Sequence, residues 1–452
     1  MSMMHLTIQV HWDHQWHDAG TVGFRTPALG LGGRPSFTYH TEYALKALER
    51  VDDLEKEDLV DQTAISLNLP CNFFRDYPNG EVAPVLRDII PQGAARRHWV
   101  KLLGYNRDPE QRIDTRLLSL GCTSPVGNLR IKEAADLFEP RAEKAPAITF
   151  DRSDIYALAD DVQQYASHGS HLIAGALGAG GDAPKLLLVE TRDGRYAFEG
   201  TVPDREVLQH WLVKLPRGKK TKADVQVLEG EAAIYRLLSE RDFNSIPGSF
   251  FFRSEGGDAL WLPRFDRLST PEGIVRHGVE SIYSLMGQAG DGARLCHSDI
   301  IARLRECVKQ PTDEDAILAD YLVRDILNTA MGNRDNHGRN MSLLKKGSGI
   351  ELAPAYDVAP MILDPEGIAS STWWPHRLLN KNRKPDYRAI LIDHATHPEA
   401  TASHMIQALK KLTNLKEGLR RHGAPAEMLN HRAIRMHEPE LVLEELGRWI
   451  DG

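Results

Sequence analysis

Three polar side chains in the last third of the chain are of the types that assist phosphoryl transfer. Asp335 and Asn340 lie in the stretch NRDNHGRN (333–340), and Asp357 follows in the stretch LAPAYDV (352–358). A phosphotransferase uses one carboxylate to steer the proton of the nucleophile, and an amide and a carboxylate to hold Mg²⁺ on the nucleotide phosphates. These residue types indicate metal-assisted phosphoryl transfer, although the same side chains could also hydrogen-bond locally in a loop or turn.

The segments around this stretch have the patterns of elements that could hold it in place. Residues 313–330 are expected to form the strongest helix of the chain, and Gly332 is suited to end it. The apolar run 341–344 could begin a strand. The helix is predicted because apolar side chains recur every four residues, at Leu318, Leu322, Ile326 and Ala330.

A glycine-rich stretch at residues 175–185 runs directly into the apolar residues 186–189, which are typical of a buried strand. Glycines before a strand allow backbone N–H groups to close on phosphates. The stretch matches neither a Walker A motif nor a full GxGxxG fingerprint. Taken alone, it is therefore better explained as a flexible loop.

Lys214 lies inside an apolar stretch, residues 211–216, that is predicted to be a strand. A buried lysine is costly unless it meets an anion, so a phosphate contact would explain its position. A lysine on an edge strand that reaches water is the alternative. A helix is expected at residues 229–238, where Glu231 is a candidate partner for this lysine.

Composition limits the class of protein. The 452 residues are 42% hydrophobic and 26% charged, as in ordinary soluble proteins of more than one subdomain. The net charge of −8 argues against nucleic-acid binding by the whole chain. The four cysteines form no CxxC pair, which predicts neither a disulfide framework nor a zinc site and favours a cytosolic protein. Neither a signal peptide nor a membrane span is expected.

The first 150 residues are expected to be α+β and carry no obvious chemistry. Strands are predicted at residues 6–10 and 20–24, and a further strand at residues 64–70. The polar segment between the first two strands contains His11, His14 and His17. We interpret it as a hairpin turn with polar side chains in water rather than as a metal site. Helices are expected at residues 42–48, 84–90, 94–103, 132–138 and 154–166.

Five motifs in one order resemble the HipA family of serine/threonine kinases, the toxins of bacterial type II toxin–antitoxin modules. The family's N-x-D-x-H-x-x-N stretch matches residues 333–340, and its LAPxYDV motif matches residues 352–358. The others are the pattern GG-x-x-PK at residues 180–185, the lysine strand VKLP at 213–216 and the RFDR motif at 264–267. The resemblance is strong from about residue 175 to 360 and weaker on either side.

The resemblance implies a role for each matching residue. Asp335 would be the catalytic base, and His337 would orient it or the phosphates. Asn340 and Asp357 would hold Mg²⁺. The residues implied in ATP binding are Gly180, Gly181, Lys185, Lys214, Phe265, Asp266 and Tyr356.

Two of these residues have alternative roles, and the glycine loop departs from the family pattern. His337 could be a purely structural hydrogen-bonding residue. Asp266 could equally be a salt-bridge partner of Arg264 or Arg267. Family members often carry an autophosphorylated serine in the glycine loop, but that position falls near Gly178 and the loop contains no serine.

The resemblance implies an α+β, two-lobed, protein-kinase-like fold. An N-terminal subdomain would span residues 1–150, a nucleotide-binding lobe 151–270 and an all-helical catalytic lobe 271–452. The implied activity is ATP- and Mg²⁺-dependent phosphorylation of serine or threonine in a cytosolic protein, in the class EC 2.7.11.1. In the best-known family members that protein is an aminoacyl-tRNA synthetase. A helix-turn-helix, HipB-like antitoxin is the implied partner, and contact with DNA would be indirect, through that antitoxin. The alternatives are a small-molecule kinase of the aminoglycoside or choline type and a catalytically weak co-repressor.

Overall fold

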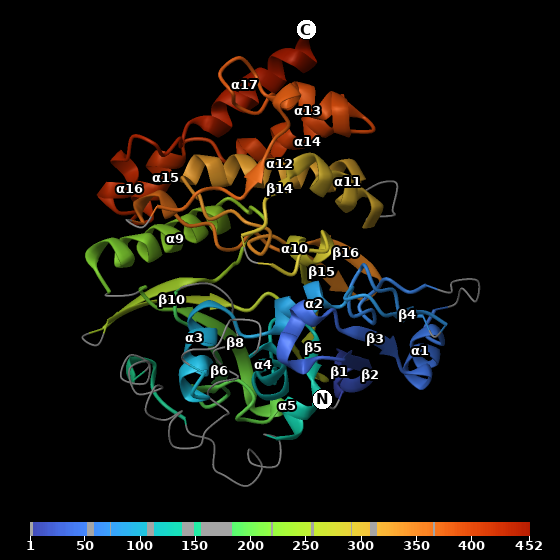
Figure 1. Ribbon diagram of the computed structural model, residues 1–452. Helices are drawn as coiled ribbons and strands as arrows, with labels where there is room; N and C mark the ends of the chain where they lie inside the picture. Colours follow the sequence, from blue (N-terminus) through green and yellow to red (C-terminus); the bar gives the residue numbers. More distant parts are fainter. Residues whose placement is uncertain are drawn as a thin grey trace. The chain divides into compact units, whose positions relative to one another are not determined.

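The computed structural model describes most of the chain (Figure 1). Its contacts divide the chain into two units that interleave in sequence, and each is described by itself. Unit 1 comprises Met1–Arg217, Phe252–Ala289 and Leu344–Gly349, and unit 2 comprises Gly218–Phe251, Gly290–Leu343 and Ile350–Gly452. The described residues are 3–51, 58–72, 74–105, 113–137, 149–154, 183–217, 220–254, 257–290, 292–307, 314–364 and 367–452.

Unit 1 begins with an antiparallel hairpin of β1 (Met4–Trp12) and β2 (Gln15–Phe24). Asp13 and His14 make the two-residue turn with φ of 50° and 56°, as the tight turn of a twisted hairpin requires. The five-stranded sheet has the order β4-β3-β2-β1-β5. Its other strands are β3 (Ser36–Tyr39), β4 (Asp76–Tyr77) and β5 (Leu129–Ile131).

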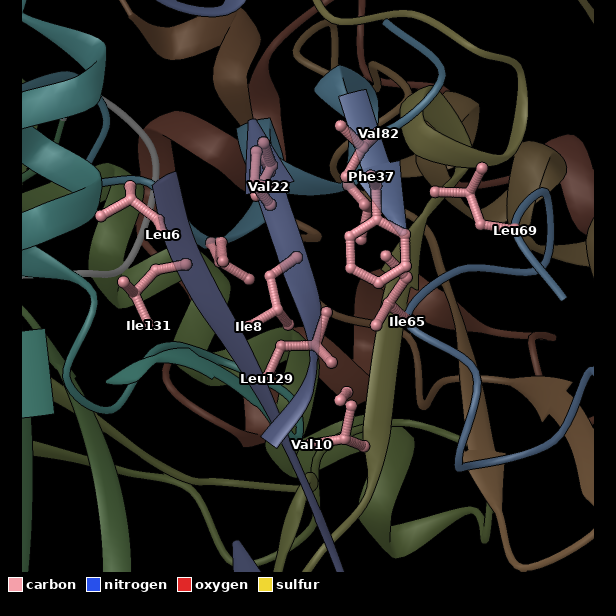
Figure 2. Close-up of a cluster of buried hydrophobic side chains, with 14 of the residues drawn as sticks. Leu6, Ile8, Val10, Val22, Phe37, Ile65, Leu69, Val82, Leu129 and Ile131 are labelled. Atoms are coloured by element: carbon pink, nitrogen blue, oxygen red, sulfur yellow. The ribbon is translucent and has the colours of Figure 1, made fainter. Parts of the chain in front are cut away.

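Alternate side chains of this sheet build the first hydrophobic core (Figure 2). Leu6, Ile8 and Val10 point to one face of β1 because successive side chains of a strand alternate. They belong to the same core as Val22 of β2 and Phe37 of β3, all of them fully or almost fully buried. The helices of this region are α1 (Thr41–Leu48), α2 (Ala83–Ile89), α3 (Gly93–Leu102), α4 (Asp114–Gly121) and α5 (Lys132–Asp136).

The second sheet has the order β7-β6-β8-β10-β9. β6 (Lys185–Thr191) carries the apolar run predicted to be a buried strand, and residues 186–189 are buried. The other strands are β7 (Tyr196–Phe198), β8 (Val207–Lys214), β9 (Phe250–Ser254) and β10 (Gly257–Pro263). Unit 1 also contains β11 (Arg267–Thr270), β12 (Gly273–Arg276), β13 (Gly278–Ser281) and α10 (Ile282–Leu285).

Unit 2 is built mainly from helices. α12 (Glu314–Met331) packs against α14 (Pro398–Lys410) and α17 (Glu438–Asp451). α9 (Lys222–Glu240) starts with a capping box in which Thr221 and Asp224 satisfy each other's backbone N–H groups. The remaining helices are α11 (His297–Cys307), α13 (Tyr387–His394), α15 (Leu415–Arg421) and α16 (Ala426–Asn430).

Short strands also occur in the C-terminal part of the chain. They are β14 (Leu295–Cys296), β15 (Ser342–Lys346), β16 (Gly349–Leu352) and β17 (Thr372–Trp373). β15 starts where the apolar run 341–344 predicted a strand. The expectation that residues 271–452 are all helical is therefore wrong, while the α+β fold class is confirmed.

Two other expectations for the N-terminal region were wrong. Residues 64–70 form no strand, because they make a buried turn with a single bridge between Ser66 and Leu69. His11 is not in water: it is 3% exposed and its Nε2 lies 3.2 Å from Nη1 of Arg276. Burial and the charge of Arg276 lower the pKa of His11 to about 2, so this histidine is neutral.

The predicted helix at residues 154–166 lies almost entirely outside the described residues. Among the residues that the structure describes, none of the helices combines the length and apolar character needed to span a bilayer.

Candidate functional site

The stretch 333–340 begins where α12 ends. Gly332 has a φ of +68°, and the backbone N–H of Asn333 donates to the carbonyl of Asn328 at 2.9 Å. This is the bond pattern with which a left-handed glycine closes a helix. A Cβ on Gly332 would come within 3.0 Å of the Ile362 side chain. Both the turn and the close approach therefore require glycine here.

Hydrogen bonds within the loop fix the backbone around Asp335. Its carbonyl accepts from the backbone N–H of His337 at 2.9 Å and from Nδ2 of Asn340 at 2.6 Å. The backbone N–H of Asn340 donates to the carbonyl of His337 at 2.8 Å. Because the amide nitrogen of Asn340 is turned to the loop, its oxygen is the atom that could face a metal.

His337 lies beside Asp335 in this loop. Its Nδ1 accepts from the backbone N–H of Arg339 at 3.2 Å, so a neutral ring carries its proton on Nε2. That Nε2 is 3.7 Å from Oδ1 of Asp335. The side chains of His337 and Asp335 are 32% and 25% exposed, which leaves the carboxylate open to a reacting group.

Asp357 is held in a backbone conformation that is uncommon for a residue with a side chain. Its φ is +54°, and its carbonyl accepts from Nδ2 of Asn333 at 2.9 Å. Two residues earlier, the N–H of Ala355 donates to the carbonyl of Asn244 at 2.9 Å. These bonds anchor the segment that carries the carboxylate.

Tyr235 and Glu231 of α9 lie close to Asp357. The Tyr235 hydroxyl donates to Oε1 of Glu231 at 3.1 Å. Burial raises the pKa of Tyr235 well above its usual value, and the charges of Glu231 and Asp357 raise it further. Glu231 thus belongs to the Asp357 surroundings in unit 2, and its pairing with Lys214 stays a prediction.

Tyr356 hydrogen-bonds to the loop through its hydroxyl. It donates to the carbonyl of Arg339 at 2.6 Å and lies 2.6 Å from Oγ of Ser342, which can donate to it. The tyrosine therefore connects the 352–358 stretch with the end of the 333–340 loop. Its contact with ATP stays a prediction.

The donor set of this region fits a hard divalent cation. The Asp357 carboxylate and the Asn340 amide oxygen are the oxygen ligands that Mg²⁺ prefers. One chain of hydrogen bonds connects the two residues, from the carbonyl of Asp357 through the side chain of Asn333 to the backbone of Asp335 and on to the side chain of Asn340. Within the described part of the chain, here included, no group of three histidine, cysteine, aspartate or glutamate residues is arranged to hold a metal, so the candidate ligands are one carboxylate and one amide oxygen.

In unit 1, two lysines face each other across neighbouring strands. Lys185 of β6 is the direct antiparallel partner of Lys214 of β8, and Lys214 is 4% exposed. Directly opposite residues of an antiparallel pair lie on the same face of the sheet, where two like charges repel. An anion on this face would be attracted by both ammonium groups. Gly180 and Gly181, which the resemblance also implies in ATP binding, are outside the described residues.

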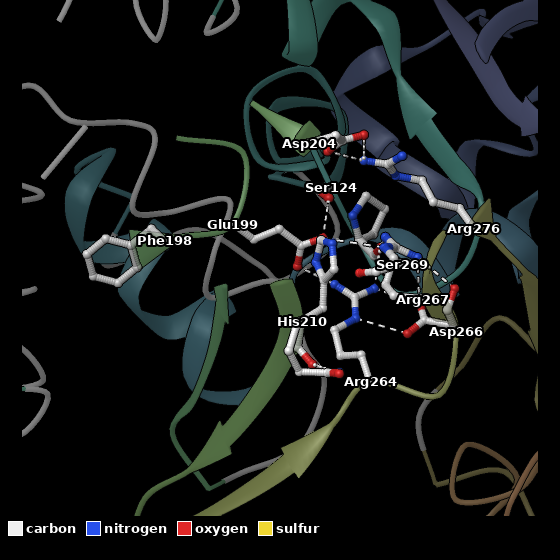
Figure 3. A network of polar contacts seen from close by, with 12 residues as sticks. Ser124, Phe198, Glu199, Asp204, His210, Arg264, Asp266, Arg267, Ser269 and Arg276 are labelled. Carbon is white, nitrogen blue, oxygen red and sulfur yellow. Dashed lines mark hydrogen bonds and ion pairs between the residues drawn. The ribbon is translucent and has the colours of Figure 1, made fainter. Parts of the chain in front are cut away.

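Asp266 forms ion pairs with both neighbouring arginines of the RFDR motif (Figure 3). Its Oδ2 is 2.6 Å from Nη2 of Arg264 and 2.7 Å from Nη1 of Arg267. Oδ2 also accepts from the backbone N–H of Gly127 at 2.7 Å. Asp266 is 1% exposed. The salt-bridge alternative is therefore present in the structure, and contact with the ribose stays a prediction.

Glu199 completes this network and was missed in the sequence. Its carboxylate pairs with Arg264, accepts from Oγ of Ser124 at 2.9 Å and lies 3.4 Å from Nδ1 of His210 (Figure 3). Burial alone would raise the pKa of Glu199, but the charges of Arg264 and Arg267 hold it well below its usual value. The excess of positive charge in the RFDR motif was the available signal, because two buried arginines need a second carboxylate.

Backbone hydrogen bonds of the residues on either side hold Phe265, the residue expected to face adenine. The N–H of Arg264 donates to the carbonyl of His210 at 3.0 Å. The carbonyl of Asp266 accepts from the N–H of His277 at 2.9 Å. Phe265 itself is half-buried, and its adenine contact stays a prediction.

Comparison with known proteins identifies the family. Residues 177–416 match the model of the HipA-like C-terminal domain, which is more than half of the chain. The chain therefore belongs to the HipA-like family. No curated protein gives a significant sequence match.

Two solved structures are similar to the chain. One is a chain from the complex of HipA, HipB and operator DNA of the Shewanella oneidensis MR-1 toxin–antitoxin system. It is 14% identical, 99% of each chain is covered and the TM-score is 0.65, which supports the fold. The other is the Helicobacter pylori proinflammatory kinase CtkA, 12% identical, with 60% of this chain and 93% of that chain covered and a TM-score of 0.37.

Proposed function

We propose that this protein is an ATP- and Mg²⁺-dependent serine/threonine protein kinase that acts as the growth-inhibiting toxin of a toxin–antitoxin module. The observation that carries the proposal is the bonded arrangement in unit 2. One loop presents the partly exposed Asp335 carboxylate and the Asn340 amide, and Asn333 ties that loop to the backbone of Asp357. An acid, an amide and a second acid held in this way match the needs of phosphoryl transfer.

Each residue has a part in the proposed reaction. Asp335 accepts the proton of the substrate hydroxyl and aligns its oxygen, while the Nε2–H of His337 lies near enough to orient the carboxylate. Asn340 and Asp357 hold Mg²⁺, which neutralises charge on the phosphates when bound. Lys185 and Lys214, which are cross-strand partners, bind the nucleotide phosphates.

The proposed organisation follows the family. The chain would form the two lobes of a kinase, with residues 1–150, 151–270 and 271–452 as its successive parts. A HipB-like antitoxin is the proposed partner, since the similar Shewanella protein is solved with HipB and operator DNA. Through this partner the kinase would be brought to DNA. Its substrate would be a cytoplasmic protein.

Phosphopeptide mass spectrometry tests the proposal. The protein is induced alone in a bacterial host, next to the variant Asp335→Asn and an empty vector. New serine or threonine phosphopeptides are expected only with the unaltered protein. Their absence, together with phosphorylation of an aminoglycoside or choline by the purified protein, would replace the proposal with a small-molecule kinase.

A further inference from the structure

The side chain of Asn333 is buried and makes hydrogen bonds with every polar atom it has. It is 7% exposed. Its Nδ2 donates to Oδ1 of Asn328 at 2.7 Å and to the carbonyl of Asp357 at 2.9 Å. Its Oδ1 accepts from the backbone N–H of Asp335 at 3.2 Å. A single carboxamide thus contacts α12, the loop with the proposed base and the segment with the proposed metal ligand.

The hydrogen bonds fix the orientation of this carboxamide. Asn328 uses its own Nδ2 on the carbonyl of Arg324 at 2.9 Å, so it presents an acceptor to Asn333. The carbonyl of Asp357 is also an acceptor, and the N–H of Asp335 is a donor. Two acceptors and one donor match the two hydrogens and the oxygen of an amide. A flipped amide would place its oxygen against two acceptors.

An aspartate at this position would be nearly isosteric but would satisfy only part of the pattern. Its carboxylate still accepts from the N–H of Asp335. It has no donor for Asn328 or for the carbonyl of Asp357, and it would place a buried negative charge beside both oxygens. The substitution therefore separates the Asp357 contact of Asn333 from its Asp335 contact.

We propose that Asn333 is a positioning residue that couples Asp335 to Asp357, so that the base and the metal ligand keep one geometry. The coupling runs through two backbone groups, the N–H of Asp335 and the carbonyl of Asp357. It matters most for Asp357, because that residue holds a left-handed φ of +54°, which costs free energy in a residue with a side chain and persists only where the surroundings hold it. Groups that orient a metal ligand typically contribute 10- to 100-fold to metal affinity or activity.

The inference rests on the proposed function, and its test keeps the two apart. Full-length wild type and Asn333→Asp are titrated with MgCl₂ by calorimetry at a saturating concentration of a non-hydrolysable ATP analogue. We expect the variant to bind Mg²⁺ at least 10-fold more weakly. In phosphorylation assays, the Mg²⁺ concentration for half-maximal rate should rise by a similar factor, while kcat at saturating Mg²⁺ should fall less.

Amide hydrogen exchange supplies a readout that needs neither metal nor activity. In Asn333→Asp, the N–H of Ala355, which donates to Asn244, should exchange faster because the neighbouring carbonyl of Asp357 has lost its donor. The N–H of Asp335 should keep its protection. In Asn333→Ser, which has no amide donor and adds no charge, both amides should exchange faster; this variant also serves if Asn333→Asp does not fold.

Asn382→Asp is the matched control, since Asn382 lies on an exposed loop of the same unit and should leave all three readouts unchanged. Wild-type Mg²⁺ affinity and wild-type exchange in Asn333→Asp would overturn the coupling while leaving the proposed function intact. Absence of Mg²⁺ binding in the wild type would overturn the proposed function, and faster exchange at Ala355 would then still support the contact of Asn333 with its segment.

Discussion

The 333–340 loop and the RFDR motif are both short, polar family motifs, but the structure holds them by different means. In the loop, neutral hydrogen bonds to backbone groups fix the chain, and the Asp335 carboxylate stays 25% exposed. In the RFDR motif, charges fix the chain, and the side chains of Arg264, Asp266 and Arg267 are each no more than 2% exposed.

This difference separates groups that can react from groups that stabilise. A partly exposed carboxylate can exchange a proton with a substrate, whereas a carboxylate that accepts several charged hydrogen bonds is held in one ionised state. Motif membership alone therefore does not identify a site residue. Burial and partners do, and the following predictions test that distinction from the largest effect to the smallest.

Asp335→Asn should abolish activity and leave stability unchanged. The amide cannot accept the proton of the nucleophile, so the rate of phosphoryl transfer should fall about 10³-fold. The backbone bonds of the loop use the N–H and carbonyl of residue 335, which the substitution keeps. Rate measurements with radiolabelled ATP check the activity, and a thermal melt checks the stability. An active variant, or one that melts much earlier, would remove Asp335 from the catalytic role.

Glu199→Gln should instead lower the stability of the fold. It leaves Arg264 and Arg267 with one carboxylate between them in a buried site, and breaking such a pair costs about 3–5 kcal/mol. Urea denaturation gives the change in the free energy of unfolding. Glu206→Gln is the matched control, because Glu206 is in the same unit and its side chain is 53% exposed. Equal stability of the two variants would show that the network contributes nothing.

Stability should depend on pH through Asp266. Burial alone would raise the pKa of its carboxyl group, but Arg264 and Arg267 hold that pKa at about 2, below the ordinary 3.8. A depressed pKa contributes stability above the unfolded value and loses it as the carboxylate is protonated, here between about pH 4 and pH 2. The difference in unfolding free energy between wild type and Asp266→Asn should therefore shrink by about 2 kcal/mol as the pH is lowered from 6 to 2. A constant difference would contradict the pairing.

The sequence predicted the elements whose signals are local. The apolar spacing of α12, the hairpin of β1 and β2 and the run in β6 each depend on neighbouring residues, and the structure has all three. The turn at residues 64–70 depends on distant partners instead. Oγ of Ser66 donates to Glu280, more than 200 residues further along the chain. The pattern of residues 64–70 does not reveal that contact, so the sequence alone predicts a strand there.

The same limit applies to the candidate site. Asp335, Asn340 and Asp357 could be proposed from the sequence because their motifs are contiguous in the chain. The hydrogen bonds behind the role proposed for Asn333 could not be predicted, because its bond to the carbonyl of Asp357 spans 24 residues and involves no side chain of its partner. Glu199 was missed for a similar reason, since its partner Arg264 is 65 residues away.

Tyr356→Phe is expected to give the smallest effect and to decide between two roles for the tyrosine. The hydroxyl donates to the carbonyl of Arg339, and losing one such neutral hydrogen bond typically costs about 1 kcal/mol. If that bond is its function, the variant should lose about this much stability, with the KM for ATP unchanged and kcat reduced less than threefold. Urea denaturation and initial rates at several ATP concentrations measure both quantities. A raised KM with unchanged stability would instead favour the contact with ATP that the sequence motif implied, and it would place Tyr356 with the reacting groups rather than with those that stabilise the loop.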